Sequence, residues 1–132
     1  MKGDLVMVKY WQRFSAVAVG GFIGGAMRES LELLLQAPNF PFATLLINLT
    51  GTFLAVFCTV WFTEKRHVNQ LLTDFISVGI LGAYTTYATL ITETSTKLAP
   101  ISGMVYIAVS ILGSVGMVYL GRWLARKVVH EV

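Results

Sequence analysis

Charged residues are scarce in this sequence, and cysteine and histidine are nearly absent. Asp, Glu, Lys and Arg together make up 13% of the 132 residues, and the mean hydropathy is +0.69, values unlike those of a soluble domain. Cys58 is the only cysteine, so an intrachain disulfide is impossible. His67 and His130 are isolated, and no group of His, Cys and carboxylate residues has the spacing of metal ligands or of a catalytic motif. These scarcities argue against an enzyme and indicate a membrane protein.

The net charge of +3 is not spread evenly along the chain. Basic residues stand at the ends of apolar segments, where they anchor helices to lipid headgroups. We therefore expect the lipid bilayer, and no nucleic acid, among the partners of this protein.

Four apolar segments are long enough to cross a hydrocarbon core of about 30 Å, which takes roughly 20 helical residues. They cover residues 14–36, 42–62, 72–98 and 101–125. The connections contain prolines or polar residues: Pro38 and Pro41, residues 64–69, and Pro100. The sequence thus predicts one all-α integral membrane domain over residues 1–132.

The third segment is unusually polar for a membrane helix. Residues 79–98 read GILGAYTTYATLITETSTKL, with two glycines, seven Thr or Ser hydroxyls and Glu93. Hydroxyls and broken helices are tolerated in hydrocarbon where they line a cavity or pack against protein. The third segment therefore is expected to line a cavity or to pack against protein, in addition to crossing the lipid.

Small and polar residues recur at helical spacing on all four segments, so each set shares one face of its helix. The sets are Gly20, Gly21, Gly24 and Gly25; Thr44, Asn48, Gly51 and Ala55; Thr85, Thr89, Thr92 and Thr96; and Tyr106, Ser110, Ser114 and Met117. Small and hydroxyl residues let helices approach closely, and this interpretation is favoured for the glycines. For the hydroxyls, the lining of a path is an equal alternative. Asn48 lies in the middle of a span, must find partners there, and offers two donors to an anion.

Two charged residues within the spans each have two interpretations. Arg28 lies about 20 Å along its helix from Ser15 at 1.5 Å per residue. It either snorkels toward the interface or pairs with Glu32 four residues later, or it shapes a vestibule for anions. Glu93 is either an interfacial residue at a helix end or an intramembrane site.

Three motifs stand out in order along the chain: GGFIGGAMR at 20–28, PFATLLINLTGTF at 41–53 and GILGAYTTYATLITE at 79–93, followed by Tyr106, Ser110 and Ser114 on the last span. In these motifs the chain resembles the Fluc (CrcB) family of small bacterial fluoride channels over nearly its whole length. The first motif alone is weak, but the patterns in order on four spans are together specific.

The resemblance implies an antiparallel dimer of four-helix subunits with two narrow fluoride pores in the bacterial cytoplasmic membrane. It implies that the third helix is broken near its middle and that a structural sodium ion lies at the dimer centre. By position, the main-chain carbonyls of Gly82 and Thr85 would hold this ion. The pore residues implied are Asn48, Tyr87, Leu90, Thr89, Glu93, Tyr106, Ser110, Thr44 and Ser114, with Arg28 at a vestibule.

The chain departs from the family pattern at four positions around the third-span motif. Tyr87 and Leu90 stand where much of the family has two phenylalanines whose ring edges face the ion. Ala88 replaces a usual serine, and Ala83 stands where glycine is common. A tyrosine ring still has a partially positive edge, whereas leucine has none. The amide and the hydroxyls are unaffected by these departures.

Two other functions fit four short spans. A small proton-coupled multidrug exporter needs an accessible carboxylate in the middle of its first helix, but Glu29 and Glu32 come late in the first span, beside Arg28. A non-transporting assembly subunit would explain the small-residue stripes but not Asn48 with three sets of hydroxyls.

The basic residues predict one preferred orientation. Four spans place both termini and the second loop on one side of the membrane. That side holds Lys2, Lys9, Arg13, Lys65, Arg66, Arg122, Arg126 and Lys127, whereas the other holds Lys97, with Arg28 near it. The positive-inside rule then predicts cytoplasmic termini. An antiparallel partner is either a second copy in the disfavoured orientation or a paralogous sister subunit with the reverse bias.

Overall fold

The computed structural model describes residues 2–65 and 68–131, and within these ranges the side chains from residue 9 onward. Arg66, His67 and the side chain of Lys2 lie outside this part. The described residues form helices and connecting turns, without a strand. The elements are α1 (Lys2–Leu34), α2 (Phe42–Glu64), α3 (Gln70–Thr73), the π-helix η1 (Asp74–Ile80), α4 (Leu81–Tyr84), α5 (Tyr87–Thr96) and α6 (Pro100–Glu131).

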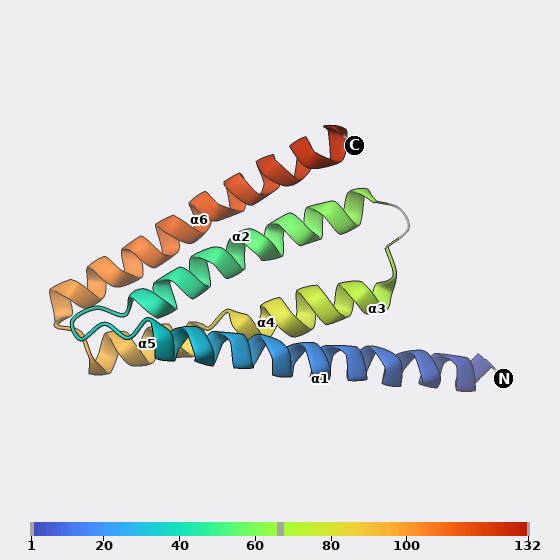
Figure 1. Cartoon of the computed structure of the whole chain (residues 1–132), viewed down its shortest axis with the longest axis horizontal. Helices are drawn as coiled ribbons and strands as arrows, with labels where there is room; N and C mark the ends of the chain where they lie inside the picture. The colour runs from blue at the N-terminus through green and yellow to red at the C-terminus, as the bar shows by residue number, and fades with distance from the viewer. Residues whose placement is uncertain (1, 66–67, 132) are drawn as a thin grey trace.

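The helices run back and forth along one long axis (Figure 1). The start of α1, the end of α2, the start of α3 and the end of α6 lie at the same end of the molecule, as the alternation of four segments predicts. Within this arrangement α2 packs mainly against α6, and α1 packs mainly against η1 and α4. The basic ends of the chain therefore gather at one end of the structure.

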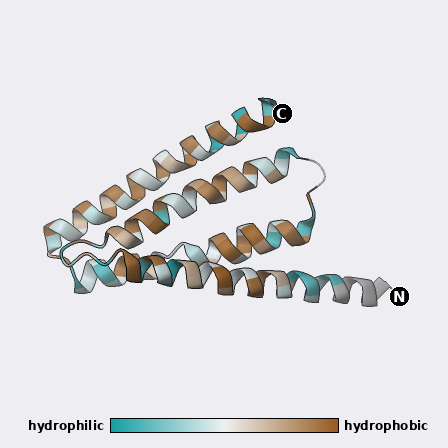
Figure 2. Ribbon diagram, in the orientation of Figure 1, coloured by the Kyte–Doolittle hydropathy of each residue, from teal (hydrophilic) through white to brown (hydrophobic). Residues whose placement is uncertain are grey.

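Three helical stretches in the described ranges are long and apolar enough to cross a membrane: Phe42–Glu64, Gln70–Thr96 and Pro100–Glu131. They agree with the predicted second, third and fourth spans, although α6 continues past the expected end at residue 125. Figure 2 shows that hydrophilic residues gather toward helix ends and hydrophobic ones between them. The protein is thus a multi-pass membrane protein. Helix α1 begins before the predicted first span and carries Arg28, Glu29 and Glu32 in its second half.

The glycines of α1 divide into two faces. A Cβ on Gly20 would collide with the carbonyl oxygen of Phe75, and one on Gly24 with the carbonyl of Ile80. These two glycines let the backbone of α1 lie directly against η1, which confirms the packing interpretation for them. A Cβ on Gly21 or Gly25 would meet nothing within 4 Å. The second pair therefore makes no close contact within the described subunit.

The third span is broken where the resemblance implies. Helix α4 ends at Tyr84, Thr85 and Thr86 have extended backbone (φ −75°, ψ 145° and φ −142°, ψ 120°), and α5 begins at Tyr87. The π-helix before the break was not expected. Its Gly79 lies against α1, where an added Cβ would stand 2.9 Å from the Cα of Gly20. The wider π turn coincides with this backbone contact, which the sequence of the segment alone does not reveal.

Candidate functional site

Asn48 and Thr86 are joined by two hydrogen bonds across the helix break. The Asn48 Nδ2 donates to the Thr86 carbonyl oxygen at 2.8 Å, and the Thr86 N–H donates to Asn48 Oδ1 at 2.8 Å. A primary amide has two N–H donors, so one Nδ2 hydrogen remains for another acceptor. The expectation that Asn48 offers both donors to an anion is therefore wrong for this conformation, because the break takes one of them.

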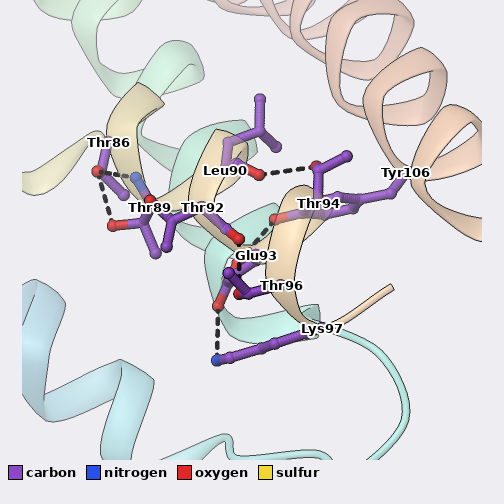
Figure 3. Close-up of polar contacts among 9 residues, drawn as sticks. All are labelled: Thr86, Thr89, Leu90, Thr92, Glu93, Thr94, Thr96, Lys97 and Tyr106. Atoms are coloured by element: carbon purple, nitrogen blue, oxygen red, sulfur yellow. Dashed lines mark hydrogen bonds and ion pairs between the residues drawn. The ribbon is translucent and has the colours of Figure 1, made fainter. Parts of the chain in front are cut away.

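Thr86 also caps the N-terminus of α5. Its Oγ1 accepts a hydrogen bond from the Thr89 N–H at 3.2 Å and donates to Thr89 Oγ1 at 2.9 Å (Figure 3). This is the usual side-chain cap of a helix N-terminus. Thr89, predicted to lie on the pore, is held at the break by Thr86.

A groove of about 400 Å³ runs between α2, α5 and α6 beside the break. Its lining includes five of the predicted pore residues, together with the predicted sodium ligand Thr85: Asn48, Tyr87, Leu90, Ser110 and Ser114. Thr52 and Thr86, which the sequence analysis did not select, line it too, with Ile111, Val115 and Val118. No charged side chain belongs to this lining within the described ranges. The sequence does contain a signal for Thr86. A threonine directly after a predicted helix break is a typical N-cap of the helix that follows.

The two residues at the aromatic positions differ sharply in environment. Tyr87 is 74% exposed, whereas Leu90 is 4% exposed and belongs to the core of the subunit. Both border the groove, but only the Tyr87 ring projects outward. Within the described subunit the two side chains therefore differ in their access to the open side of the groove. Ser110 is buried, and its hydroxyl donates to the carbonyl of Tyr106 at 2.7 Å on its own helix.

A second polar cluster lies beyond the groove, around Glu93. The fully buried Tyr106 donates its hydroxyl hydrogen to Glu93 Oε2 at 3.1 Å, and Lys97 Nζ donates to Glu93 Oε1 at 3.4 Å (Figure 3). Glu93 and Lys97 border a cavity of about 620 Å³ near the end of α1, which Glu29 and Glu32 also line. Glu93 is thus buried within the subunit and lies one turn before the end of α5, so both interpretations of this residue stay predictions. The predicted pore residues thus occupy two regions, with Leu90 and the fully buried Thr44 in the core.

The expected pairing of Arg28 with Glu32 is not formed. Among the described residues no salt bridge includes Arg28, and both its Nε and the Glu32 Oε1 are buried without a hydrogen-bond partner. The absence of this pair does not test the role of Arg28 at a vestibule, which stays a prediction.

The sequence analysis did not anticipate an ion pair that joins α1 to η1. Arg13 near the start of α1 forms a salt bridge with the buried Asp74, the first residue of η1. Gln70 Nε2 donates to the same carboxylate at 2.9 Å. The two residues are 61 positions apart, so no short sequence pattern predicts the contact. It fastens α1 to the start of the third span.

The break leaves main-chain carbonyls without their helical donors, and those of Gly82 and Thr85 are among them. In a continuous helix the N–H of residue i bonds to the carbonyl of residue i−4. The Thr86 N–H, which would reach Gly82, goes to Asn48 instead, and the Thr89 N–H, which would reach Thr85, goes to Thr86 Oγ1. Gly82 is exposed. Oxygen ligands of this kind suit a hard cation, and no group of His, Cys, Asp and Glu in the described ranges could hold a metal instead.

Comparison with known proteins identifies relatives of this chain. A sequence model of the family described as CrcB-like protein, Camphor Resistance (CrcB), matches residues 15–122. A curated relative from Listeria innocua, named fluoride-specific ion channel FluC 2, is 34% identical over 121 residues, covering 89% of this chain and 94% of the relative. A relative of the same name from Carboxydothermus hydrogenoformans is 37% identical over 120 residues, covering 89% and 90%. One from Halalkalibacterium halodurans is 33% identical over 115 residues, covering 86% and 85%. With the broken third helix, the central amide and this match across all four segments, the chain belongs to the CrcB-like protein family.

Proposed function

We propose that this protein is a fluoride channel that lets cytoplasmic fluoride leave a bacterial cell passively through the cytoplasmic membrane. The observation that carries the proposal is the uncharged groove at the helix break, where Asn48 retains one free amide hydrogen. The names of the relatives, all fluoride-specific ion channels, support the choice of ion. The activity is conduction, and no reaction is catalysed.

The chemistry of the groove suits a small, strongly hydrated anion. A selective path must replace the water around the ion with close, hard donors, yet bind weakly enough to release it. Amide and hydroxyl hydrogens meet both needs, whereas a lysine in the path would hold the ion too tightly. Tyr87 adds an exposed ring edge with partial positive charge beside Asn48. Arg28 forms a cationic vestibule away from the narrow part.

The active form in this proposal is an antiparallel dimer. All four predicted spans cross the membrane, α1 included, and the groove is open on one side until a second, inverted subunit covers it. A sodium ion at the dimer centre binds the freed carbonyls of Gly82 and Thr85 from each subunit. The exposure of Gly82 and the diverted Thr86 N–H support this placement. The ion supplies long-range positive potential without a charged side chain in the path.

The test of conduction is fluoride efflux from liposomes that contain the purified protein, followed with a fluoride electrode. Wild-type protein should release fluoride and not chloride. Asn48→Ala should abolish release, whereas Thr59→Val, which removes a hydroxyl bonded to its own helix at Ala55, should release fluoride normally. Wild-type liposomes that retain fluoride, in a preparation shown to be correctly inserted, would refute the function.

The partner subunit is tested separately. In a Cys58→Ala background, single cysteines at positions 9, 65 and 131 are labelled from outside intact cells that express only this chain. Substantial labelling of a fully inserted fraction supports dual insertion and a homodimer. Strictly internal sites, with fluoride resistance only when a second family member is co-expressed, support the sister subunit.

A further inference from the structure

We infer that Asn48 is the positioning residue that keeps the third helix broken and thereby keeps the Gly82 carbonyl available to a cation. The inference rests on the proposed sodium site. It assigns to Asn48 a second role, within its own subunit, in addition to donating to the permeating ion.

The helical hydrogen-bond ladder stops at the Thr86 N–H, which donates to Asn48 instead of to a helical carbonyl. The preceding N–H, that of Thr85, makes the ordinary helical bond to the Leu81 carbonyl at 3.1 Å. The next in line, the Thr86 N–H, would continue the ladder to Gly82 but donates to Asn48 Oδ1 at 2.8 Å. One side chain from α2 therefore interrupts the helix at one peptide group.

The contact is two-way, which explains why an amide stands at this position. Asn48 Nδ2 donates to the carbonyl of the same residue, Thr86, at 2.8 Å. A carboxylate lacks the donor, and a shorter hydroxyl cannot present a donor and an acceptor side by side. The pair of bonds holds Thr86 in its extended conformation, as a strand partner would.

The backbone of α2 comes close enough for this contact because residue 51 is glycine. A Cβ on Gly51 would collide with the Cγ2 of Thr85. Gly51 lies about one turn from Asn48 on the same helix face, so the broken segment rests directly on α2. The Gly82 side of the segment is open, and the nearest atom to an added Cβ there is the Ser77 carbonyl oxygen at 3.9 Å.

Loss of the amide should close the break. Without Asn48 Oδ1, the Thr86 N–H is a donor in a low-dielectric environment and must find another acceptor, and the Gly82 carbonyl lies one helical turn back. Once bonded, that carbonyl is a poorer cation ligand. Asn48→Ala should therefore weaken sodium binding although Asn48 itself does not touch the ion.

The experiment measures thermal unfolding of the full-length purified protein in sodium chloride and in N-methyl-D-glucamine chloride, after exhaustive exchange of bound ions. A ligand of the folded assembly at about 100 times its dissociation constant raises the folding equilibrium about 100-fold. Wild type should show a sodium-dependent rise in the midpoint, and Asn48→Ala should lose most of it. Thr52→Val is the matched control. Its hydroxyl lines the same groove and donates to the Asn48 carbonyl on α2, so its loss leaves the Thr86 contact intact and the sodium response unchanged.

A second change tests the route of the effect. Proline has no backbone N–H and keeps the preceding residue extended. Thr85, the residue before Thr86, is already extended at φ −75° and ψ 145°. The double variant Asn48→Ala with Thr86→Pro should regain the sodium response because residue 86 then has no N–H to bond the Gly82 carbonyl, yet it should not regain fluoride efflux. If Asn48→Ala fails to fold, Asn48→Asp keeps an oxygen acceptor for the Thr86 N–H and should retain the response.

Three results would overturn the inference: a wild-type response in Asn48→Ala, a double variant that stays insensitive to sodium, or loss of the response in folded Asn48→Asp. Wild-type protein that conducts fluoride but ignores sodium also overturns it, and leaves the channel function standing. Wild-type protein that responds to sodium without conducting fluoride refutes the channel instead.

Discussion

The four glycines of α1 allow a paired test of how this subunit is held together. Gly20 and Gly24 face the backbone of η1, whereas Gly21 and Gly25 have open space around them. Alanine at any of the four positions adds the same methyl group and the same gain in helix propensity. Differences between the pairs therefore report only what the new methyl group meets.

The expected difference is substantial. A Cβ on Gly20 overlaps the Phe75 carbonyl oxygen and lies 3.0 Å from the Cα of Gly79 and 3.1 Å from the N of Ile80. All three atoms belong to the backbone and cannot rotate away, so α1 must move off its neighbours. Overpacking of this kind costs about 1–3 kcal/mol, offset by up to about 1 kcal/mol of helix propensity. Because the propensity gain cancels between Gly20→Ala and Gly21→Ala, the two should differ by about 1–3 kcal/mol.

The assay is reversible unfolding in mixed detergent micelles, followed by tryptophan fluorescence at several protein concentrations. Gly20→Ala and Gly24→Ala should lower subunit stability at every concentration. Gly21→Ala and Gly25→Ala should leave the stability of the subunit unchanged or raise it slightly. If this face meets a second subunit, the two variants should weaken only the concentration-dependent transition. Equal, concentration-independent losses for both pairs would refute the assignment of faces.

Three further predictions follow from the observed contacts. Leu90→Ala should lower thermal stability by about 2–5 kcal/mol because it leaves a cavity in the core, whereas Tyr87→Ala should leave thermal stability unchanged but reduce fluoride efflux. Tyr106→Phe should cost about 1–3 kcal/mol in thermal unfolding, since it deprives a buried carboxylate of its hydroxyl donor, and an unchanged midpoint would show that this hydrogen bond contributes nothing. Arg13→Gln should lower the unfolding midpoint because it leaves Asp74 unpaired, and adding Asp74→Asn should recover part of the loss. A double variant less stable than either single variant would contradict the ion-pair explanation.

Local sequence predicts much of the architecture. Apolar runs of membrane length, bounded by Pro41, Pro100 and charged residues, predict the positions of α2, the third span and α6 closely, because burial in hydrocarbon depends on composition over about 20 residues. The Thr-Thr pair at residues 85–86 lies where the helix breaks. The motif order on four segments was enough to identify the family.

Other features depend on which helix faces meet, and helical spacing cannot reveal that. Gly20 and Gly21 look equivalent in the sequence, but α1 turns only the first toward η1. Leu90 and Tyr87 are three residues apart, yet one is buried and the other projects outward. The periodicity of a helix determines which residues share a face, whereas the neighbouring helices determine what that face touches.

Asn48 illustrates the division most clearly. A polar amide in the middle of an apolar span must be hydrogen-bonded or functional, and that much follows from the physical chemistry of the bilayer. Its partners are the main-chain N–H and carbonyl of Thr86, 38 positions away, and only the tertiary structure brings the two residues together. Local sequence thus determined that this protein crosses the membrane with a polar centre. The packing of α2 on the third span decided how that centre is held open, because the hydrogen-bonding groups of a broken helix take whatever donors and acceptors the neighbouring helix presents.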